Sequence, residues 1–162
     1  MTAVADTSVL IALARLNLLS LLHELFGDMA IPDAVADEAL RFRADAPANT
    51  FIVDAMNHGW LHIEPTRPPA EFLGKLGSGE REAIHLARAI AAEVVIIDDL
   101  SAHRAASELG LEVTGTAGVL KAARGRGMIE AAAPLLVRLR SQGFHIGDEL
   151  IDEIRQEEEH GS

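Results

Sequence analysis

Short apolar runs alternate with helix-patterned segments along this chain, and that alternation restricts its fold more than any other feature. Five runs have the length and the apolar content of buried strands. They are residues 2–5, 29–31, 60–63, 94–97 and 112–114. Strands separated by helices pair in parallel, because each helix carries the chain back across the sheet. The alternation therefore predicts a three-layer α/β/α fold around a parallel five-stranded sheet.

Apolar residues at helical spacing fill the segments between these runs. The expected helices are residues 33–44, 48–58, 79–91, 101–109, 116–125, 130–141 and 147–158. Residues 8–26 are expected to form either one helix or two short helices with a break near Asn17. The proline-rich residues 64–71 are expected to form a connector without regular structure.

The size of the chain suits one domain with a sizeable core. It has 162 residues, of which 49% are apolar. No linker or internal repeat divides it. We therefore expect a single domain over residues 1–162, ending in an acidic helix at about residues 147–158.

The composition also excludes several kinds of protein. There are no cysteines, which excludes disulfides and thiolate metal sites and favours a reducing compartment. Asp6 falls where a signal peptide needs an uninterrupted apolar stretch. No apolar stretch approaches the roughly 20 residues of a membrane span. These features predict a cytoplasmic protein without a membrane segment.

The formal net charge of −11 is unevenly distributed. From Asp148 onward there are seven acidic residues and one basic residue, Arg155, so about half of the net charge lies in this short tail. An acidic total argues against broad, charge-driven binding to nucleic acid.

Acidic residues stand where the expected sheet would gather them. Asp6 ends the first strand, Asp98 and Asp99 follow the fourth, and Glu80 and Glu82 open the helix between the third and fourth strands. Ligands of parallel sheets bind at the carboxyl ends of the strands. Carboxylates that meet there repel one another unless a cation or a shared proton relieves them.

Each acid also has a purely structural interpretation. Asp6, followed by Thr7 and Ser8, suits the capping of a helix, with Thr7 or Ser8 as the N-cap. Acids in a first helical turn interact favourably with the helix dipole, by about 0.3–1 kcal/mol each. The Asp98–Asp99 pair is harder to explain, because capping the next helix needs one carboxylate. Since no His or Cys stands at ligand spacing beside these acids, an all-oxygen site would favour Mg²⁺ or Mn²⁺ over zinc.

Five segments together resemble the PIN-domain family over nearly the whole chain. They are ADTSVLIAL (5–13), IPDAVADEAL (31–40), GEREAIHLA (79–87), VIIDDLSAHRAASELGLEVTGTAGVL (95–120) and the following KAARGRGMI (121–129). The best match is a PIN-like branch with a Gly-Thr-x-Gly-Val-Leu segment, here residues 115–120. The resemblance implies the sheet order 3-2-1-4-5, which would place the first and fourth strands side by side.

The resemblance also implies an activity. PIN domains are Mg²⁺- or Mn²⁺-dependent ribonucleases, and many are VapC-type toxins paired with an antitoxin. The expected function is therefore an endoribonuclease that hydrolyses RNA phosphodiesters as the toxin of a type II toxin–antitoxin pair. Its partners would be RNA, an antitoxin protein and a second copy of the chain. The alternative is a non-catalytic PIN-like binding module or subunit. A phosphoacceptor of the receiver type ranks last, because its acid pair would follow the first strand.

The acids of the family map onto this chain one by one. The first matches Asp6, the second Glu38, the third Glu82 and the fourth Asp99. These four form the expected catalytic set. Two further acids, Glu80 and Asp98, complete the expected metal ligands. Glu80 is included because Gly-Glu-x-Glu-Ala resembles the paired glutamates of flap endonucleases. Asp98 is included because the Asp-Asp pair leaves open which of its two members binds metal.

Other polar residues flank these acids and have two interpretations each. The expected RNA contacts are Ser8, Arg81, His103 and Arg104. Each of these also suits a helix cap or a weak surface ion pair. A basic strip comprises Lys121, Arg124 and Arg126. This strip would either follow an RNA backbone or simply place positive charges at a helix C-terminus, where the helix dipole favours cations. The acidic terminal helix would be a solvated face or would cover a basic surface.

Overall fold

A computed structural model describes residues 2–41 and 46–161 of the chain. The chain divides into two compact units, Met1–Thr116 and Ala117–Ser162. The prediction of one domain over the whole chain stays a prediction. The helix expected over residues 33–44 includes residues 42–44, which lie outside the described residues.

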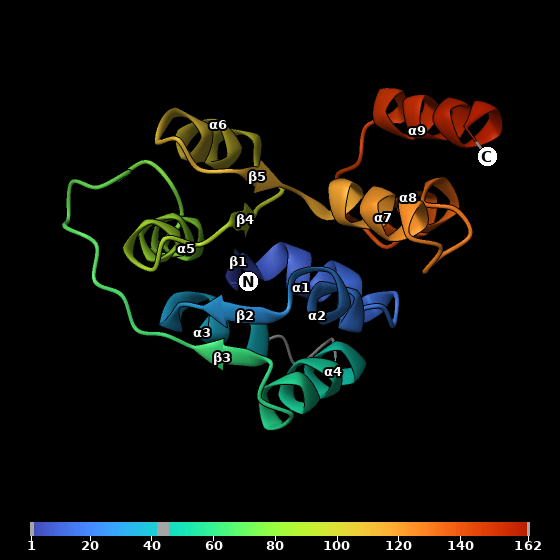
Figure 1. The fold of residues 1–162 in the computed structure, drawn as a ribbon. Helices are drawn as coiled ribbons and strands as arrows, with labels where there is room; N and C mark the ends of the chain where they lie inside the picture. The colour runs from blue at the N-terminus through green and yellow to red at the C-terminus, as the bar shows by residue number, and fades with distance from the viewer. Residues whose placement is uncertain (1, 42–45, 162) are drawn as a thin grey trace. The chain divides into compact units, whose positions relative to one another are not determined.

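The first unit contains the predicted parallel sheet (Figure 1). Its strands are β1 (Thr2–Ala5), β2 (Asp28–Ile31), β3 (Leu61–Ile63), β4 (Val94–Ile96) and β5 (Val113–Thr114). They pair in parallel in the order β3-β2-β1-β4-β5. This confirms both the fold class and the strand order that the sequence predicts. Ala5 lies opposite Ile96, so β1 and β4 end at the same level of the sheet.

The helices follow the predicted segments closely. In the first unit they are α1 (Thr7–Arg15), α2 (Ser20–Phe26), α3 (Asp33–Arg41), α4 (Ala46–Asn57), α5 (Ser78–Ala89) and α6 (Leu100–Glu108). Helix α7 (Thr116–Gly125) begins at the last residue of that unit, and α8 (Ala133–Ser141) and α9 (Asp148–His160) follow.

Residues 8–26 form two helices rather than one, so the second of the two alternatives is correct. Asn17 adopts a positive φ of 58° between α1 and α2, a conformation that asparagine tolerates better than most residues. Among the helices that the structure describes, none alone is long and apolar enough to cross a membrane; α1 and α2 pass that test only as a pair bent by 115°.

Small side chains allow α5 and α6 to lie close to the sheet. Ala83, Ala87, Ala102 and Ala106 are buried and form a cluster with sheet residues such as Val95. Alanine also has the highest helix propensity. This cluster fixes the start of α5 beside the end of β1, where the acids lie.

The connector between β3 and α5 is anchored to α5 by hydrogen bonds and ring contacts. Arg81 donates from Nε to the Phe72 carbonyl at 2.6 Å and from Nη2 to the Pro69 carbonyl at 2.7 Å. The Phe72 ring meets His85 edge-on at 5.2 Å, and Arg88 lies 5.9 Å from its centroid. The structure therefore gives Arg81 a role in holding the chain that leads to α5.

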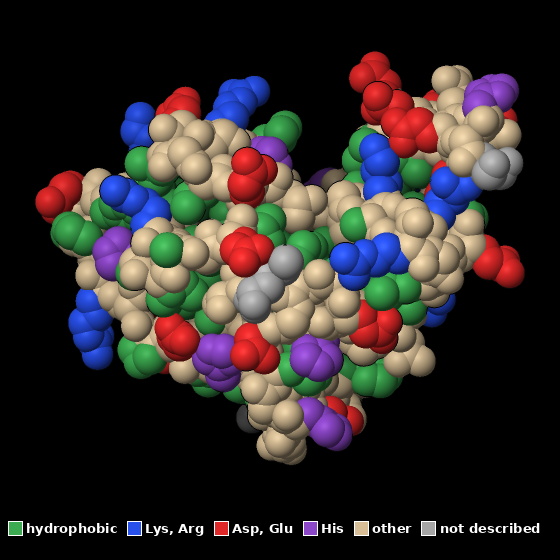
Figure 2. Space-filling view, in the orientation of Figure 1, with side chains coloured by type: hydrophobic (Ala, Val, Ile, Leu, Met, Phe, Trp, Pro, Cys, Tyr) green, Lys and Arg blue, Asp and Glu red, His purple; other side chains and the backbone are tan. Residues whose placement is uncertain are grey.

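Within the second unit, the acidic helix α9 pairs with the basic strip of its own chain. Lys121 lies 3.1 Å from Glu157, and Arg124 lies 3.4 Å from Glu158. The Glu158 carboxylate also accepts from the Ala132 and Ala133 N–H groups at 2.5 and 3.1 Å. In Figure 2, acidic side chains gather over α9 and basic ones lie between it and the helices beneath it. Part of the strip is thus neutralised within the chain.

Candidate active site at the carboxyl edge of the sheet

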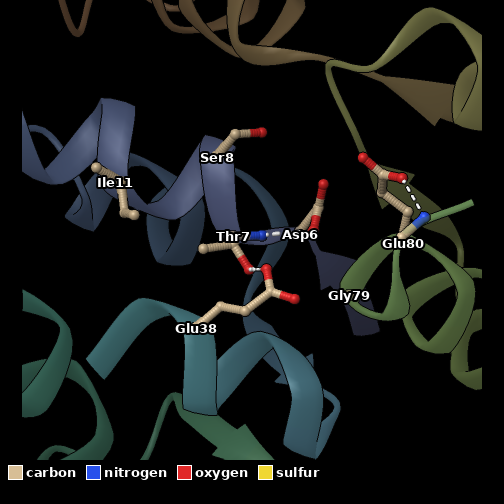
Figure 3. A pocket seen from close by; sticks show the side chains of 8 residues that line it. Asp6, Thr7, Ser8, Ile11, Glu38, Gly79 and Glu80 are labelled. Atoms are coloured by element: carbon tan, nitrogen blue, oxygen red, sulfur yellow. Dashed lines mark hydrogen bonds between the residues drawn. The ribbon is translucent and has the colours of Figure 1, made fainter. Parts of the chain in front are cut away.

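An acidic pocket of about 300 Å³ lies where β1 ends (Figure 3). Four segments build it: the end of β1, the first turns of α1, the middle of α3 and the start of α5. Its lining residues are Asp6, Thr7, Ser8, Ile11, Glu38, Gly77, Gly79 and Glu80. Three of the predicted metal ligands, Asp6, Glu38 and Glu80, therefore share one pocket, together with Ser8 from the predicted RNA contacts.

Asp6 is the buried acid of this acidic pocket, with 5% of its surface exposed. It is the N-cap of α1, and its Oδ1 accepts from the Thr7 N–H at 2.7 Å. The expectation that Thr7 or Ser8 caps this helix is wrong, because Asp6 has the extended backbone of a cap (φ −89°, ψ 165°) and the helix begins at Thr7. Capping and a place in the pocket are thus compatible.

The environment of Asp6 favours its neutral form. The pKa of Asp6 is raised from 3.8 to about 7, chiefly by burial; the hydrogen bond from Thr7 opposes this rise, and the carboxylates of Glu80, Glu38 and Asp98 add to it. An acid in this situation ionises readily when a cation takes the place of the missing solvent.

Glu38 reaches the acidic pocket from α3. The Thr7 hydroxyl donates to its Oε2 at 3.0 Å, as Figure 3 shows. A Cβ on Gly79 would lie 3.0 Å from both Glu38 carboxylate oxygens and 3.3 Å from Asp6 Oδ1. Three oxygens of two acids therefore converge on the bare backbone of Gly79. The sequence alone assigns no role to Gly79, because the two acids that it faces are distant along the chain.

Glu80 lies in the acidic pocket and Glu82 does not line it. Burial raises the pKa of Glu80, with smaller contributions from Asp99 and Glu38, whereas the Gly77 N–H, which donates to its carboxylate at 3.1 Å, lowers it. The Glu82 carboxylate instead accepts from the Ala34 N–H at 3.3 Å, at the start of α3. Residues two apart on a helix project about 200° apart, so one helix cannot direct both glutamates to the same point. The structure thus places Glu80, rather than the expected Glu82, among the pocket acids.

Asp98 and Asp99 both follow β4, and each has a structural partner. Asp98 accepts from the Thr116 N–H at 2.7 Å and from its hydroxyl at 2.6 Å. Asp99 caps α6 by accepting from the Ala102 N–H at 2.9 Å. Neither lines the acidic pocket, but Asp98 raises the pKa of Asp6 and Asp99 that of Glu80, so both act on it electrostatically.

The other predicted RNA contacts lie outside the acidic pocket. Arg81 is bonded to the connector, and His103 and Arg104 lie on α6. Within residues 2–41 and 46–161, no group of three His, Cys, Asp or Glu residues forms a ready-made metal site. The donors that do share the pocket are carboxylates, whose hard oxygens suit Mg²⁺ or Mn²⁺. Their convergence on the bare Gly79 fits such an ion.

Comparison with known proteins agrees with the fold. The chain matches the family model described as "PIN domain" over residues 2–160. No curated protein matches it. Among solved structures, it resembles a PilT N-terminus domain protein from the hyperthermophilic archaeon Sulfolobus solfataricus P2, with 20% identity, a TM-score of 0.52, and coverage of 75% of this chain and 92% of that one.

A domain of a functionally unknown protein from Methanocaldococcus jannaschii DSM 2661 matches with 21% identity and a TM-score of 0.46, over 70% of this chain and 89% of that one. The family match spans nearly the whole sequence. The chain therefore belongs to the PIN-domain family, whose members are generally nucleases that use divalent metal ions.

Proposed function

We propose that this protein is a Mg²⁺- or Mn²⁺-dependent endoribonuclease that hydrolyses RNA phosphodiesters. Asp6, Glu38 and Glu80 would hold the ion, and Asp98 and Asp99 would add negative charge at the edge of the site. Glu82, expected in the catalytic set, is not part of this proposal because its carboxylate bonds to the start of α3.

One observation carries the proposal: three carboxylates from three separate segments share a 300 Å³ pocket, and the most buried of them has a pKa of about 7. Like charges brought together in this way destabilise the fold unless they are compensated. Perturbed acids that converge in a concave site are typical of functional centres. A divalent cation is the simplest compensating partner for an all-oxygen set.

The chemistry follows from the nature of the site. A bound Mg²⁺ or Mn²⁺ lowers the pKa of a water molecule and offsets the charge that develops on a phosphate. Asp6 and Glu38 would fix the ion from the end of β1 and from α3. Glu80, at the start of α5, would hold the opposite side of the acidic pocket. Because the pocket is acidic, RNA phosphates would approach it only when the ion is bound.

The proposal is tested with purified protein and RNA in the presence of Mn²⁺ or Mg²⁺. Cleavage is expected to stop with EDTA and in Asp6→Asn, and to persist in Glu153→Gln, which removes the same charge from an exposed position on α9. Absence of cleavage of varied RNAs by the wild type with either ion would contradict the proposal.

We further propose that the protein acts in the cytoplasm, as a homodimer, as the toxin of a type II toxin–antitoxin pair. Membership of the PIN-domain family supports this role. An adjacent small open reading frame for a DNA-binding protein is expected. Expression of the wild-type chain should arrest growth, co-expression of that neighbour should relieve the arrest, and Asp6→Asn should be harmless. Growth arrest by Asp6→Asn equal to that of the wild type would count against it.

A second candidate function is a binding module without turnover. It is favoured by the hydrogen bonds of Glu82, Asp98 and Asp99, which each serve the backbone at the start of a helix. Such a module would retain these acids for folding. It predicts no calorimetric Mn²⁺ binding at millimolar metal together with tight association with a partner protein, whereas the nuclease predicts measurable Mn²⁺ binding by the isolated chain.

A further inference from the structure

Thr7 lies between the two acids that meet at Gly79. Its N–H donates to Asp6 Oδ1 at 2.7 Å, and its hydroxyl donates to Glu38 Oε2 at 3.0 Å. Thr7 is 9% exposed; its contact with Asp6 is buried, and its contact with Glu38 is partly buried. One residue thereby connects acids that are far apart in the sequence and lie on different elements.

Holding the Glu38 side chain in one conformation has an entropic cost. It projects from the exposed side of α3, and a glutamate side chain loses about 1.5–2 kcal/mol of rotamer entropy when it is held in one conformation. A hydrogen bond to a carboxylate is stronger than one between neutral groups and offsets part of this cost. Among the described contacts of Glu38, the Thr7 hydroxyl is the donor that reaches its carboxylate.

We propose that Thr7 is a positioning residue: its hydroxyl holds the Glu38 carboxylate beside Asp6, in front of Gly79. The role of Thr7 in placing the Glu38 carboxylate does not depend on the proposed function. The expected change in metal affinity does depend on it. Thr7 acts through Glu38 and need not touch the ion or the RNA.

The competing explanation is that Thr7 simply begins α1. In that case the backbone N–H to Asp6 would be the important contact, and a side chain of the same shape without a hydroxyl would serve equally well. Thr7→Val has that shape, and Thr7→Ser keeps the hydroxyl. The two variants therefore separate a positioning role from a packing role.

The test compares the wild type, Thr7→Val and Thr7→Ser by metal-free crystal structures and by Mn²⁺ calorimetry. In Thr7→Val, the Glu38 carboxylate is expected to leave Gly79, and Mn²⁺ affinity is expected to fall about tenfold, as the loss of one charge-assisted hydrogen bond implies. Thr7→Ser should keep the carboxylate in place and bind Mn²⁺ within about twofold of the wild type. Thr7→Ala replaces Thr7→Val if the latter does not fold.

The two readouts keep the proposals separate. If the wild type binds no Mn²⁺, the proposed function is wrong, and the position of Glu38 in the metal-free variants still decides the role of Thr7. If Thr7→Val leaves the carboxylate beside Asp6, or binds Mn²⁺ as the wild type does, the positioning role is overturned. Loss of Mn²⁺ binding in Thr7→Ser equal to that in Thr7→Val would also overturn it.

Discussion

At the scale of single residues, Asp6 lines the acidic pocket, and its ionised form destabilises the metal-free fold. Its pKa is raised to about 7 from 3.8. Between these values the folded protein keeps a proton on Asp6 that the unfolded chain has lost. Metal-free stability is therefore expected to fall as the pH rises through this window. The full cost above pH 7 is on the order of 4 kcal/mol.

Asp6→Asn is expected to remove this pH dependence. Asparagine caps helices about as well as aspartate, so the variant should melt at a higher temperature than the wild type at pH 8 without metal. Mn²⁺ should raise the melting temperature of the wild type and leave that of Asp6→Asn unchanged. Thermal melts from pH 4 to 8 measure both effects. A variant no more stable than the wild type at pH 8 would argue against the strain assigned to Asp6.

Gly79→Ala is expected to separate stability from metal binding. Alanine stabilises a helix by about 0.5–1 kcal/mol relative to glycine, but its Cβ would lie 3.0 Å from both Glu38 oxygens. The carboxylates would have to move, so Mn²⁺ affinity should fall at least about tenfold while the melting temperature is maintained. Gly125→Ala is the control, since a Cβ there meets nothing within 4 Å. Unchanged Mn²⁺ affinity in Gly79→Ala would refute this role.

The two glutamates of α5 are expected to differ in their effect on metal binding. Glu80→Gln should weaken Mn²⁺ binding about tenfold or more, because it removes a charge from the acidic pocket. Glu82→Gln keeps an acceptor for the Ala34 N–H and should bind Mn²⁺ within about twofold of the wild type. Calorimetric titration of both variants with Mn²⁺ shows which of the two glutamates is the metal ligand. The reverse order would restore Glu82 as the ligand that the sequence favoured.

The sequence predicts the candidate acids of the site more readily than the directions of their side chains. The position after the first strand predicts Asp6, and the family resemblance adds Glu38. The choice between Glu80 and Glu82 depends on the direction from which α5 approaches β1. That direction is set by tertiary packing of alanines such as Ala83 and Ala87, which sequence spacing does not reveal. The role of Gly79 likewise depends on two acids that are distant in the chain.

At the scale of elements, the alternation of strands and helices was sufficient to predict the sheet. All five strands and the break near Asn17 lie where the apolar pattern places them. The connector after β3 was predicted to lack regular structure, but its attachment to α5 through Arg81 was not foreseen, because carbonyl acceptors such as that of Phe72 carry no signal in the sequence.

Arg81→Met is expected to loosen this connector. The substitution keeps much of the aliphatic stem but loses two hydrogen bonds to carbonyls, for a cost of about 1–3 kcal/mol. Limited proteolysis should cut residues 64–77 faster in the variant than in the wild type, while Arg104→Met, on the exposed side of α6, should not change the rate. Equal cleavage rates would show that Arg81 does not anchor the connector.

At the scale of the whole molecule, the fold and the family membership agree with what the sequence predicted. The net charge of −11 argues against general attraction to RNA, and an ion at the acidic pocket would be needed to bring phosphates to it. This edge of the sheet is therefore expected to bind a divalent cation.

Calorimetric titration of the metal-free protein with Mn²⁺, at a pH above 7, measures binding of such a cation. The wild type is expected to bind Mn²⁺ with release of protons, because Asp6 still holds part of its proton near that pH. Asp6→Asn is expected to lose both the binding and the proton release, and Glu153→Gln to retain both. Absence of Mn²⁺ binding by the wild type at millimolar metal, or equal binding by Asp6→Asn, would contradict the assignment of this site.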